Sequence, residues 1–371
     1  MDPDRRRDVL ADIAAALLII GAAAACLAVS IGGEKAYRSA FQLGLPPIAV
    51  ALVAGVFAWP RPRAKFVVSQ AALIIAAAVG VVGYEYFVPQ VYGVPDTANL
   101  PAEFRRLVPL HVRLTKAKPG EWLDDNIELG QSYGQYIEGE RIRSDAARRT
   151  IYVQPLGDFT SHERKIVNLT AEFLGLFYQL PVRVRDDLPL SIVPDSARRD
   201  RPNDGRVLLY SYPVLREVLK PRLPDDAVAM IALTTVGIRK SEQGAGLFGS
   251  ASFVDRVGLW TMGGLGDPTA GEREFVETLR RVLHVAVHET GHMFSIEHCV
   301  YYRCCMNGCS GRQEMDTQPL WFCPQCQAKV AYATGGDPAK QLTEIITFAE
   351  RHGLQPEAAF WHRSLAAIKT P

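Results

Sequence analysis

Apolar and polar residues alternate in the second half of the chain in a way that predicts an α/β domain. Short β-branched or continuously apolar runs predict strands at residues 150–155, 182–184, 227–233, 248–254 and 257–262. Apolar residues at the helical period predict helices at residues 162–178, 214–219, 342–351 and 357–368. A longer helix begins at Glu272 and carries one apolar face. These elements assign residues 150–371 to one domain.

A different pattern occupies residues 1–90. Three runs, residues 13–31, 41–59 and 66–84, contain no Asp, Glu, Lys or Arg. At ~1.5 Å per residue each helix is about 28 Å long, close to the thickness of the hydrocarbon layer. A cleaved signal peptide is the alternative for the first run, but two further runs follow it. The sequence therefore predicts about three transmembrane helices and the lipid bilayer as a partner.

Basic residues predict the orientation of these helices. Arg5, Arg6 and Arg7 precede the first run, and further basic residues fill the short loop before the third. Three spans with these loops inside would place the C-terminal domain outside the cytoplasm. If residues 41–59, interrupted near their start by a Pro-Pro pair, do not cross, the domain lies on the cytoplasmic face instead. Residues 91–149, which begin proline-rich, are predicted to be a linker and lead-in segment.

The net charge limits the classes of partner, and the distribution of cysteines indicates the kind of site. A net charge of +1 gives no reason to expect nucleic acid. Six of the seven cysteines fall between Cys299 and Cys326, a distribution typical of a metal site rather than of a scattered disulfide framework.

The strongest chemical signal is His288-Glu289-Thr290-Gly291-His292, followed six residues later by His298. Histidines at i and i+4 lie on one face of a helix, so both imidazoles can reach one ion. Glu289 lies beside that ion and suits a general base better than a ligand. Three imidazoles leave a fourth position open, which is the layout of a catalytic zinc.

The histidine spacing resembles that of the metzincin peptidases, HExxHxxGxxH, except that Ser295 stands where most members have Gly. The following cysteines make the chain similar to the archaemetzincin family in particular. That resemblance implies a metzincin-like zincin domain, a mixed sheet plus an active-site helix. It also implies two zinc ions per chain, with a structural zinc on the residues that match the family's motif, namely Cys299, Cys304, Cys323 and Cys326. Met306 matches the methionine of the Met-turn.

Other interpretations of these residues stay open. The cysteines are alternatively disulfides or buried thiols, although a CxxC pair facing a Cys-x4-Cys pair favours zinc. Cys305 and Cys309 fit neither role and are not assigned. His284 lies one turn before His288, but its spacing alone gives it no role in metal binding.

The resemblance also implies a place for the substrate. In metzincins an edge strand pairs with an extended peptide, and residues 247–253 match it best, with Gly249, Ser250 and Ala251 as candidate substrate-binding residues. An edge strand without a bound partner is the equal alternative. Two short motifs at residues 119–123 and 130–133 resemble the segment before the peptidase domain of longer archaemetzincins. A strap packed on the domain is favoured for them over a substrate or inhibitory role.

The sequence thus predicts a membrane-anchored zinc metallopeptidase. In this hypothesis Glu289 takes a proton as water attacks a peptide carbonyl, and returns it to the leaving amine. The alternative is a membrane-anchored two-zinc module that binds a partner without cleaving it. The pattern does not separate aminopeptidase from endopeptidase specificity.

Overall fold

The computed structural model describes residues 95, 97–126, 128–200, 207–242 and 246–370, all within one compact unit, Val91–Pro371. The three predicted transmembrane helices at residues 13–31, 41–59 and 66–84 lie outside the described residues. Within those residues, no helix combines the length and the apolar character needed to cross a bilayer. The predicted fold class, with about three transmembrane helices before the domain, is therefore corrected to what the described residues show. The fold class that the structure gives is a mixed α/β fold.

A five-stranded sheet with the order β2-β1-β5-β9-β8 forms the centre of the fold. Its strands are β1 (Thr150–Leu156), β2 (Val182–Val184), β5 (Ala227–Thr234), β8 (Gly249–Ala251) and β9 (Val257–Thr261). The first four in this order are parallel, and β8 pairs antiparallel with β9 at the edge. All residues of β1, β5 and β9 are buried, as their continuous apolar runs require for central parallel strands.

A second, four-stranded sheet with the order β3-β4-β6-β7 was not predicted from the sequence. It consists of β3 (Arg198–Asp200), β4 (Val207–Tyr210), β6 (Gly237–Arg239) and β7 (Gly246–Leu247). The predicted strand at residues 248–254 is shorter in the structure and is limited to β8.

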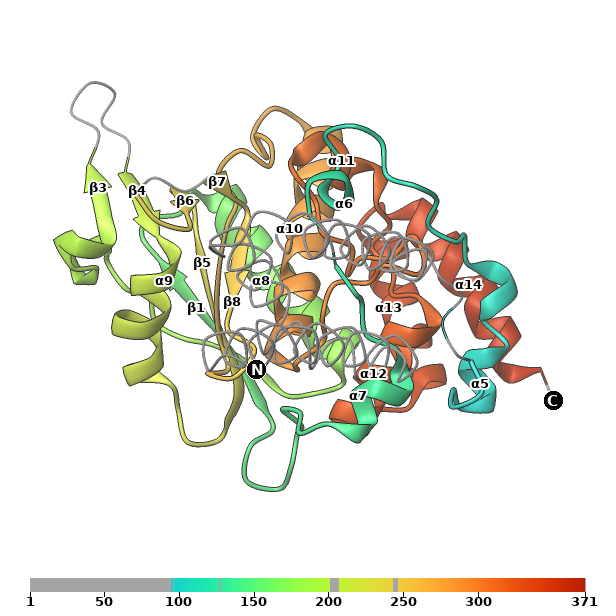
Figure 1. Cartoon of the computed structure of the whole chain (residues 1–371). Coiled ribbons are helices and arrows are strands. Elements are labelled where there is room, and N and C mark those ends of the chain that lie inside the picture. The colour runs from blue at the N-terminus through green and yellow to red at the C-terminus, as the bar shows by residue number, and fades with distance from the viewer. Residues whose placement is uncertain (1–94, 96, 127, 201–206, 243–245, 371) are drawn as a thin grey trace, which may run out of the picture. The chain divides into compact units, whose positions relative to one another are not determined.

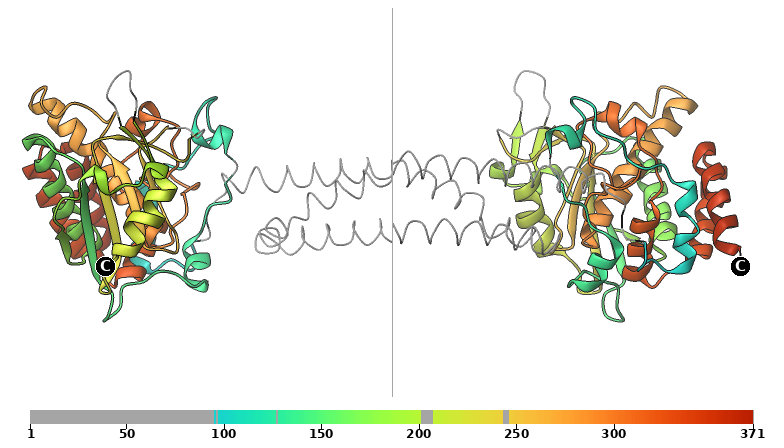
Figure 2. Two further views of the ribbon diagram at one scale, coloured as in Figure 1. Left: turned by 90° about the vertical axis from the view of Figure 1, so that its left-hand side faces the viewer. Right: turned by 45° about the vertical axis from the view of Figure 1, so that its right-hand side comes forward.

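Helices cover both faces of the central sheet (Figure 1). One face packs against the π-helix Val214–Leu219, which directly follows α9 (Ser211–Pro213), and a continuous apolar core lies between this helix and the sheet. The other face packs against α8 (Ser161–Tyr178) and α10 (Glu272–Met293). The C-terminal helices α12 (Pro324–Thr334), α13 (Pro338–Arg351) and α14 (Gln355–Lys369) lie beyond α8 and α10, and Figure 2 (right) shows β3 and these helices at opposite sides of the unit.

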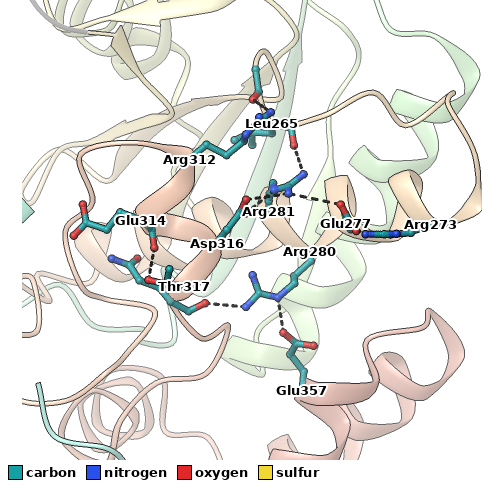
Figure 3. A network of polar contacts seen from close by, with 12 residues as sticks. Leu265, Arg273, Glu277, Arg280, Arg281, Arg312, Glu314, Asp316, Thr317 and Glu357 are labelled. Carbon is teal, nitrogen blue, oxygen red and sulfur yellow. Dashed lines mark hydrogen bonds and ion pairs between the residues drawn. The ribbon is translucent and has the colours of Figure 1, made fainter. Parts of the chain in front are cut away.

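Charged side chains fix α10 to its neighbours along its polar face (Figure 3). Arg280 Nε donates to Glu357 Oε1 of α14 at 2.6 Å, and Glu357 is 2% exposed. Arg281 donates to both carboxylate oxygens of Asp316, in α11 (Arg312–Thr317), at 2.6 and 3.0 Å. A bidentate pair and a buried pair define the position of α10 more tightly than single exposed ion pairs would.

Residues 119–138, here called the strap, run across the domain between two helices. The strap contains α6 (Trp122–Asp125), which lies beside α11, and α7 (Tyr133–Glu138), which lies beside α12 (Figure 1). The shorter helices α5 (Ala102–Arg105) and Val108–Leu110 precede it. Phe104, Leu107 and Tyr136 are at most 2% exposed, so the lead-in segment contributes to the hydrophobic core.

Candidate metal centres and active-site residues

Helix α10 carries His288 and His292 on successive turns and ends at Met293. The end is a Schellman motif, in which the Ile296 N–H donates to the Gly291 carbonyl at 3.0 Å and the Ser295 N–H to the His292 carbonyl at 2.8 Å. This motif reverses the chain direction. The reversal returns His298 to the same side as the two helical histidines.

Ser295 occupies the position in this motif that needs a left-handed backbone. Its φ is 62°, as its place after the helix predicts. The Ser295 hydroxyl offsets part of the resulting strain, because it accepts from Ile142 N–H at 3.3 Å and donates to the Phe253 carbonyl at 3.2 Å. Serine therefore lacks the backbone freedom of glycine but makes two contacts, which join the turn after α10 to Phe253, after β8, and to Ile142, after the strap.

We expect Ser295→Ala to be less stable than Ser295→Gly by about 0.4–1 kcal/mol, because alanine keeps the strained φ while losing both hydrogen bonds. Ser295→Gly should unfold within about 0.5 kcal/mol of the wild type, since relief of strain offsets the lost bonds. Urea titrations of the three proteins measure these differences. Equal stability of the two variants would show that backbone strain at residue 295 is negligible.

The three predicted histidine ligands converge on one point. Donor atoms of His288, His292 and His298 all lie within 4.8 Å of one another, and the Nε2 atoms of His288 and His292 are 3.0 Å apart. A tetrahedral zinc with Zn–N bonds of about 2.0–2.1 Å separates its ligand nitrogens by about 3.3 Å. The donor set and spacing therefore fit a zinc ion.

Each of these histidines has a partner for its other ring nitrogen. His288 Nδ1 lies 2.8 Å from the Cys305 carbonyl, and His292 Nδ1 lies 2.7 Å from the Ile296 carbonyl. His298 Nδ1 lies 2.7 Å from Glu128 Oε1. These acceptors fix the tautomer with the proton on Nδ1, so that Nε2 is free to bind a metal.

Burial keeps the helical imidazoles neutral, which is the form that binds a metal. It lowers the pKa of His288 to about 3 and the pKa of His292 well below its usual value. The lowered pKa values of both histidines therefore also fit a bound cation, because a protonated imidazole has no lone pair to donate to a metal.

Glu289 lies beside the histidine group and is 6% exposed. Burial raises the pKa of Glu289 to about 8, so its carboxylate is a stronger proton acceptor than an exposed one. The backbone of β8 approaches this side chain closely, because a Cβ at Gly249 would lie 2.2 Å from Glu289 Oε1. Only glycine at residue 249 leaves the carboxylate in place.

The three candidate substrate-binding residues Gly249, Ser250 and Ala251 are the whole of strand β8. β8 is the last strand in the order of its sheet, paired on one side with β9. Through Gly249 the structure brings this edge next to Glu289. An edge strand can pair with an extended peptide through its remaining backbone groups.

The four predicted cysteine ligands form a second group. The Sγ atoms of Cys299, Cys304, Cys323 and Cys326 lie within 4.8 Å of one another, and each residue is at most 2% exposed. The Sγ atoms of Cys299 and Cys323 are 3.6 Å apart, far beyond a disulfide bond but close to the about 3.8 Å between thiolates on one zinc.

The environment of these thiols also fits a cation. Burial raises the pKa of Cys304 and of Cys323 well above the usual value, whereas the pKa of Cys299 is lowered, against its burial, by hydrogen bonds from the neighbouring thiols. One thiolate is thus stabilised within the group, and further thiolates need a positive charge beside them. Cys304 Sγ accepts from the Cys323 N–H at 3.2 Å. Backbone donors of this kind stabilise thiolate sulfur.

The unassigned cysteines lie apart from this group. Cys305 Sγ donates to the His284 carbonyl at 3.4 Å, and the His284 side chain is buried. Neither Cys305, His284 nor Cys309 belongs to a metal-binding group among the described residues. Met306 lies under the catalytic helix, where a Cβ at Gly291 would come within 2.6 Å of its sulfur.

Sequence reasoning did not identify the partners of the histidine rings. Glu128 lies 170 positions before His298, and no motif spacing connects the two. The other two partners are backbone carbonyls of Ile296 and Cys305, which carry no side-chain signal.

Comparisons with known proteins complete the description. A family model described as Peptidase family M54 matches residues 212–332, a range that contains both ligand groups. Archaemetzincin-2 of Homo sapiens is 24% identical over 268 residues, covering 64% of this chain and 74% of the human protein. Archaemetzincin of Thermococcus kodakarensis is 32% identical over 198 residues, covering 49% of this chain and 95% of that protein. The crystal structure of archaemetzincin from Methanopyrus kandleri is 21% identical with a TM-score of 0.41, covering 51% of this chain and 96% of that one.

Proposed function

The chain belongs to the archaemetzincin family of zinc metallopeptidases, and we propose that it hydrolyses peptide bonds at a zinc on His288, His292 and His298, with Glu289 as the general base. The enzyme class, a zinc-dependent metallopeptidase acting on peptides, follows from the family. The assignment of individual residues is our proposal.

One observation carries it. Three histidine donor atoms converge, and Glu289, the residue after the first of these histidines in α10, is buried. When bound, zinc lowers the pKa of a water molecule and polarises a carbonyl group. The protein's own residues supply the proton transfers and the positioning.

Glu289 is the residue that handles the proton. As the water oxygen attacks the peptide carbonyl carbon, the Glu289 carboxylate accepts a proton from the water. When the C–N bond breaks, the same carboxyl gives that proton to the leaving amine. Burial raises the pKa of Glu289 above that of an exposed carboxyl, which brings its proton affinity closer to that needed for transfer near neutral pH.

Strand β8 orients the peptide in this proposal. An extended substrate pairs with the edge formed by Gly249, Ser250 and Ala251, by the same backbone hydrogen bonds that join strands in a sheet. Gly249 lies against Glu289, so a paired backbone would pass close to the general base.

A second zinc on Cys299, Cys304, Cys323 and Cys326 has a structural role in this proposal. All four cysteines are buried, and a tetrathiolate leaves no open position for a substrate. The group stabilises the chain that follows His298, including Met306 beneath the active-site helix.

The direct test is a zinc count combined with peptide hydrolysis. We expect the full-length wild type to hold two zinc ions and to cleave members of a peptide library. His292→Ala should hold one zinc, stay folded by circular dichroism and release no product, because it removes one of three catalytic ligands. A variant that keeps both zinc ions would show that the histidines are not a metal site. Full cleavage by the one-zinc variant would separate hydrolysis from this site.

A further inference from the structure

The three histidines differ in the acceptor that faces the Nδ1 atom of each ring. His288 and His292 each have a backbone carbonyl at Nδ1, whereas His298 has a carboxylate oxygen, Glu128 Oε1, at 2.7 Å. We propose that Glu128 of the strap is the positioning residue for His298, so that the strap completes the catalytic metal centre. This inference rests on the proposed function and assigns a role to a residue that lies before the family match at residues 212–332.

His298 needs such a partner because of its place in the chain. His288 and His292 belong to α10, whose backbone fixes where their side chains begin. His298 follows the end of that helix and lies outside any helix or strand. Its Nδ1 partner therefore has a larger share in setting the plane of its ring.

A carboxylate also changes the ligand itself. An imidazole that donates its Nδ1 proton to a carboxylate is a more basic ligand at Nε2 than one that donates to a neutral carbonyl. Three neutral imidazoles bring no negative charge to a zinc ion, and the carboxylate of Glu128 offsets part of the ion's charge. Orientation and charge thus both strengthen the bond made by His298.

Trp122 holds Glu128 in this position. Its Nε1 donates to Glu128 Oε1 at 2.9 Å, the same oxygen that faces His298. The indole ring meets the His298 ring edge-on with centroids 5.5 Å apart, and it occupies the space that a side chain at Gly308 would fill. The Trp122 N–H donates to the carboxylate of Glu314 at 3.1 Å, which fixes this end of the strap to α11.

The other end of the strap is fixed to the domain by buried polar contacts. Tyr133 N–H donates to Gln325 Oε1 at 2.6 Å, and Lys329, which is 1% exposed, donates to the Gln131 carbonyl. Tyr136 Oη donates to the Phe294 carbonyl, in the turn after α10, at 2.6 Å. With both ends anchored, Glu128 presents its carboxylate from a defined position.

The test compares zinc affinity in full-length variants, measured by competition with a chromophoric chelator. The catalytic zinc is identified as the ion that His292→Ala lacks. Glu128→Ala should weaken binding of this ion about 10–100-fold. Glu128→Gln keeps an acceptor oxygen for Trp122 and His298 but loses the charge, so its zinc affinity should lie between those of Glu128→Ala and the wild type. Asp125→Ala, an exposed strap carboxylate, is the matched control and should bind zinc like the wild type.

A second measurement separates positioning from general support of the fold. The metal-free proteins are compared by thermal unfolding, where Glu128→Ala should resemble Asp125→Ala. If Glu128→Ala binds zinc as tightly as the wild type, the inference is wrong. It is also wrong if Glu128→Gln and Glu128→Ala lose the same zinc affinity and both metal-free proteins are unfolded. A wild type that holds no zinc on its histidines overturns the proposed function instead, so the two failures are distinguishable.

Discussion

Replacing Glu289 with Gln is expected to lower kcat for peptide hydrolysis about 10²–10⁴-fold while the zinc content stays at the wild-type value. The amide has nearly the same shape as the carboxylate but cannot accept the proton of the attacking water. Because Glu289 is not one of the three grouped histidine ligands, its replacement leaves those ligands intact. Peptide cleavage followed by mass spectrometry, with zinc measured on the same samples, checks both parts of this prediction.

Gly249→Ala tests the same carboxylate from the side of the strand. The added Cβ would come within 2.2 Å of Glu289 Oε1 and must displace it. A displacement of about 1 Å is sufficient to cost about 10²-fold in rate, so kcat should fall without loss of zinc. Gly246→Ala, in β7, is the matched control, because a Cβ at that residue meets no atom within 4 Å. Equal products from the wild type and Glu289→Gln would contradict the assignment of the general base.

Replacing Cys326 with Ser is expected to remove the structural zinc and to lower the free energy of unfolding by about 4 kcal/mol or more. A structural zinc contributes its binding free energy to folding, and a serine hydroxyl is a poor substitute for a thiolate ligand. Cys326 is fully buried in the first turn of α12, the helix that also anchors the strap through Gln325 and Lys329. Urea titration and zinc analysis measure the two effects.

Cys309→Ser is the control for this change, because Cys309 lies in the same stretch but outside the four-cysteine group. It should keep both zinc ions and the wild-type unfolding curve. A wild type that contains one zinc and oxidised cysteines would exclude a tetrathiolate site.

The active-site helix could be predicted from the sequence because its signals are local. The apolar face from Glu272 and the i, i+4 histidines are properties of one helix, and the structure places them on α10. The positive φ of Ser295 followed in the same way, from its place where the helix must end. The two hydrogen bonds of its hydroxyl could not be predicted, since Ile142 and Phe253 are distant in sequence.

Non-local features were the ones that sequence reasoning missed. The strands β3, β4, β6 and β7 have two to four residues each, too short for a periodic signal. The lead-in segment has weak periodicity, yet Phe104, Leu107 and Tyr136 are buried in the domain. The runs that predict transmembrane helices lie in residues 1–90, outside the described residues, which themselves form a mixed α/β fold.

The contact between Glu128 and His298 has a further consequence for the order in which the site can form and open. It closes a chain segment of 170 positions, whereas His288 and His298 are only ten positions apart. By the logarithmic dependence of loop-closure entropy on length, the longer closure costs about 2.5 kcal/mol more. The three histidine ligands can therefore come together within a short stretch of chain. Bringing the strap to His298 costs more loop-closure entropy than bringing the histidines together. When the native protein opens locally, the strap is the part expected to detach first, leaving a site that still holds its ligands together but has lost the orientation of His298.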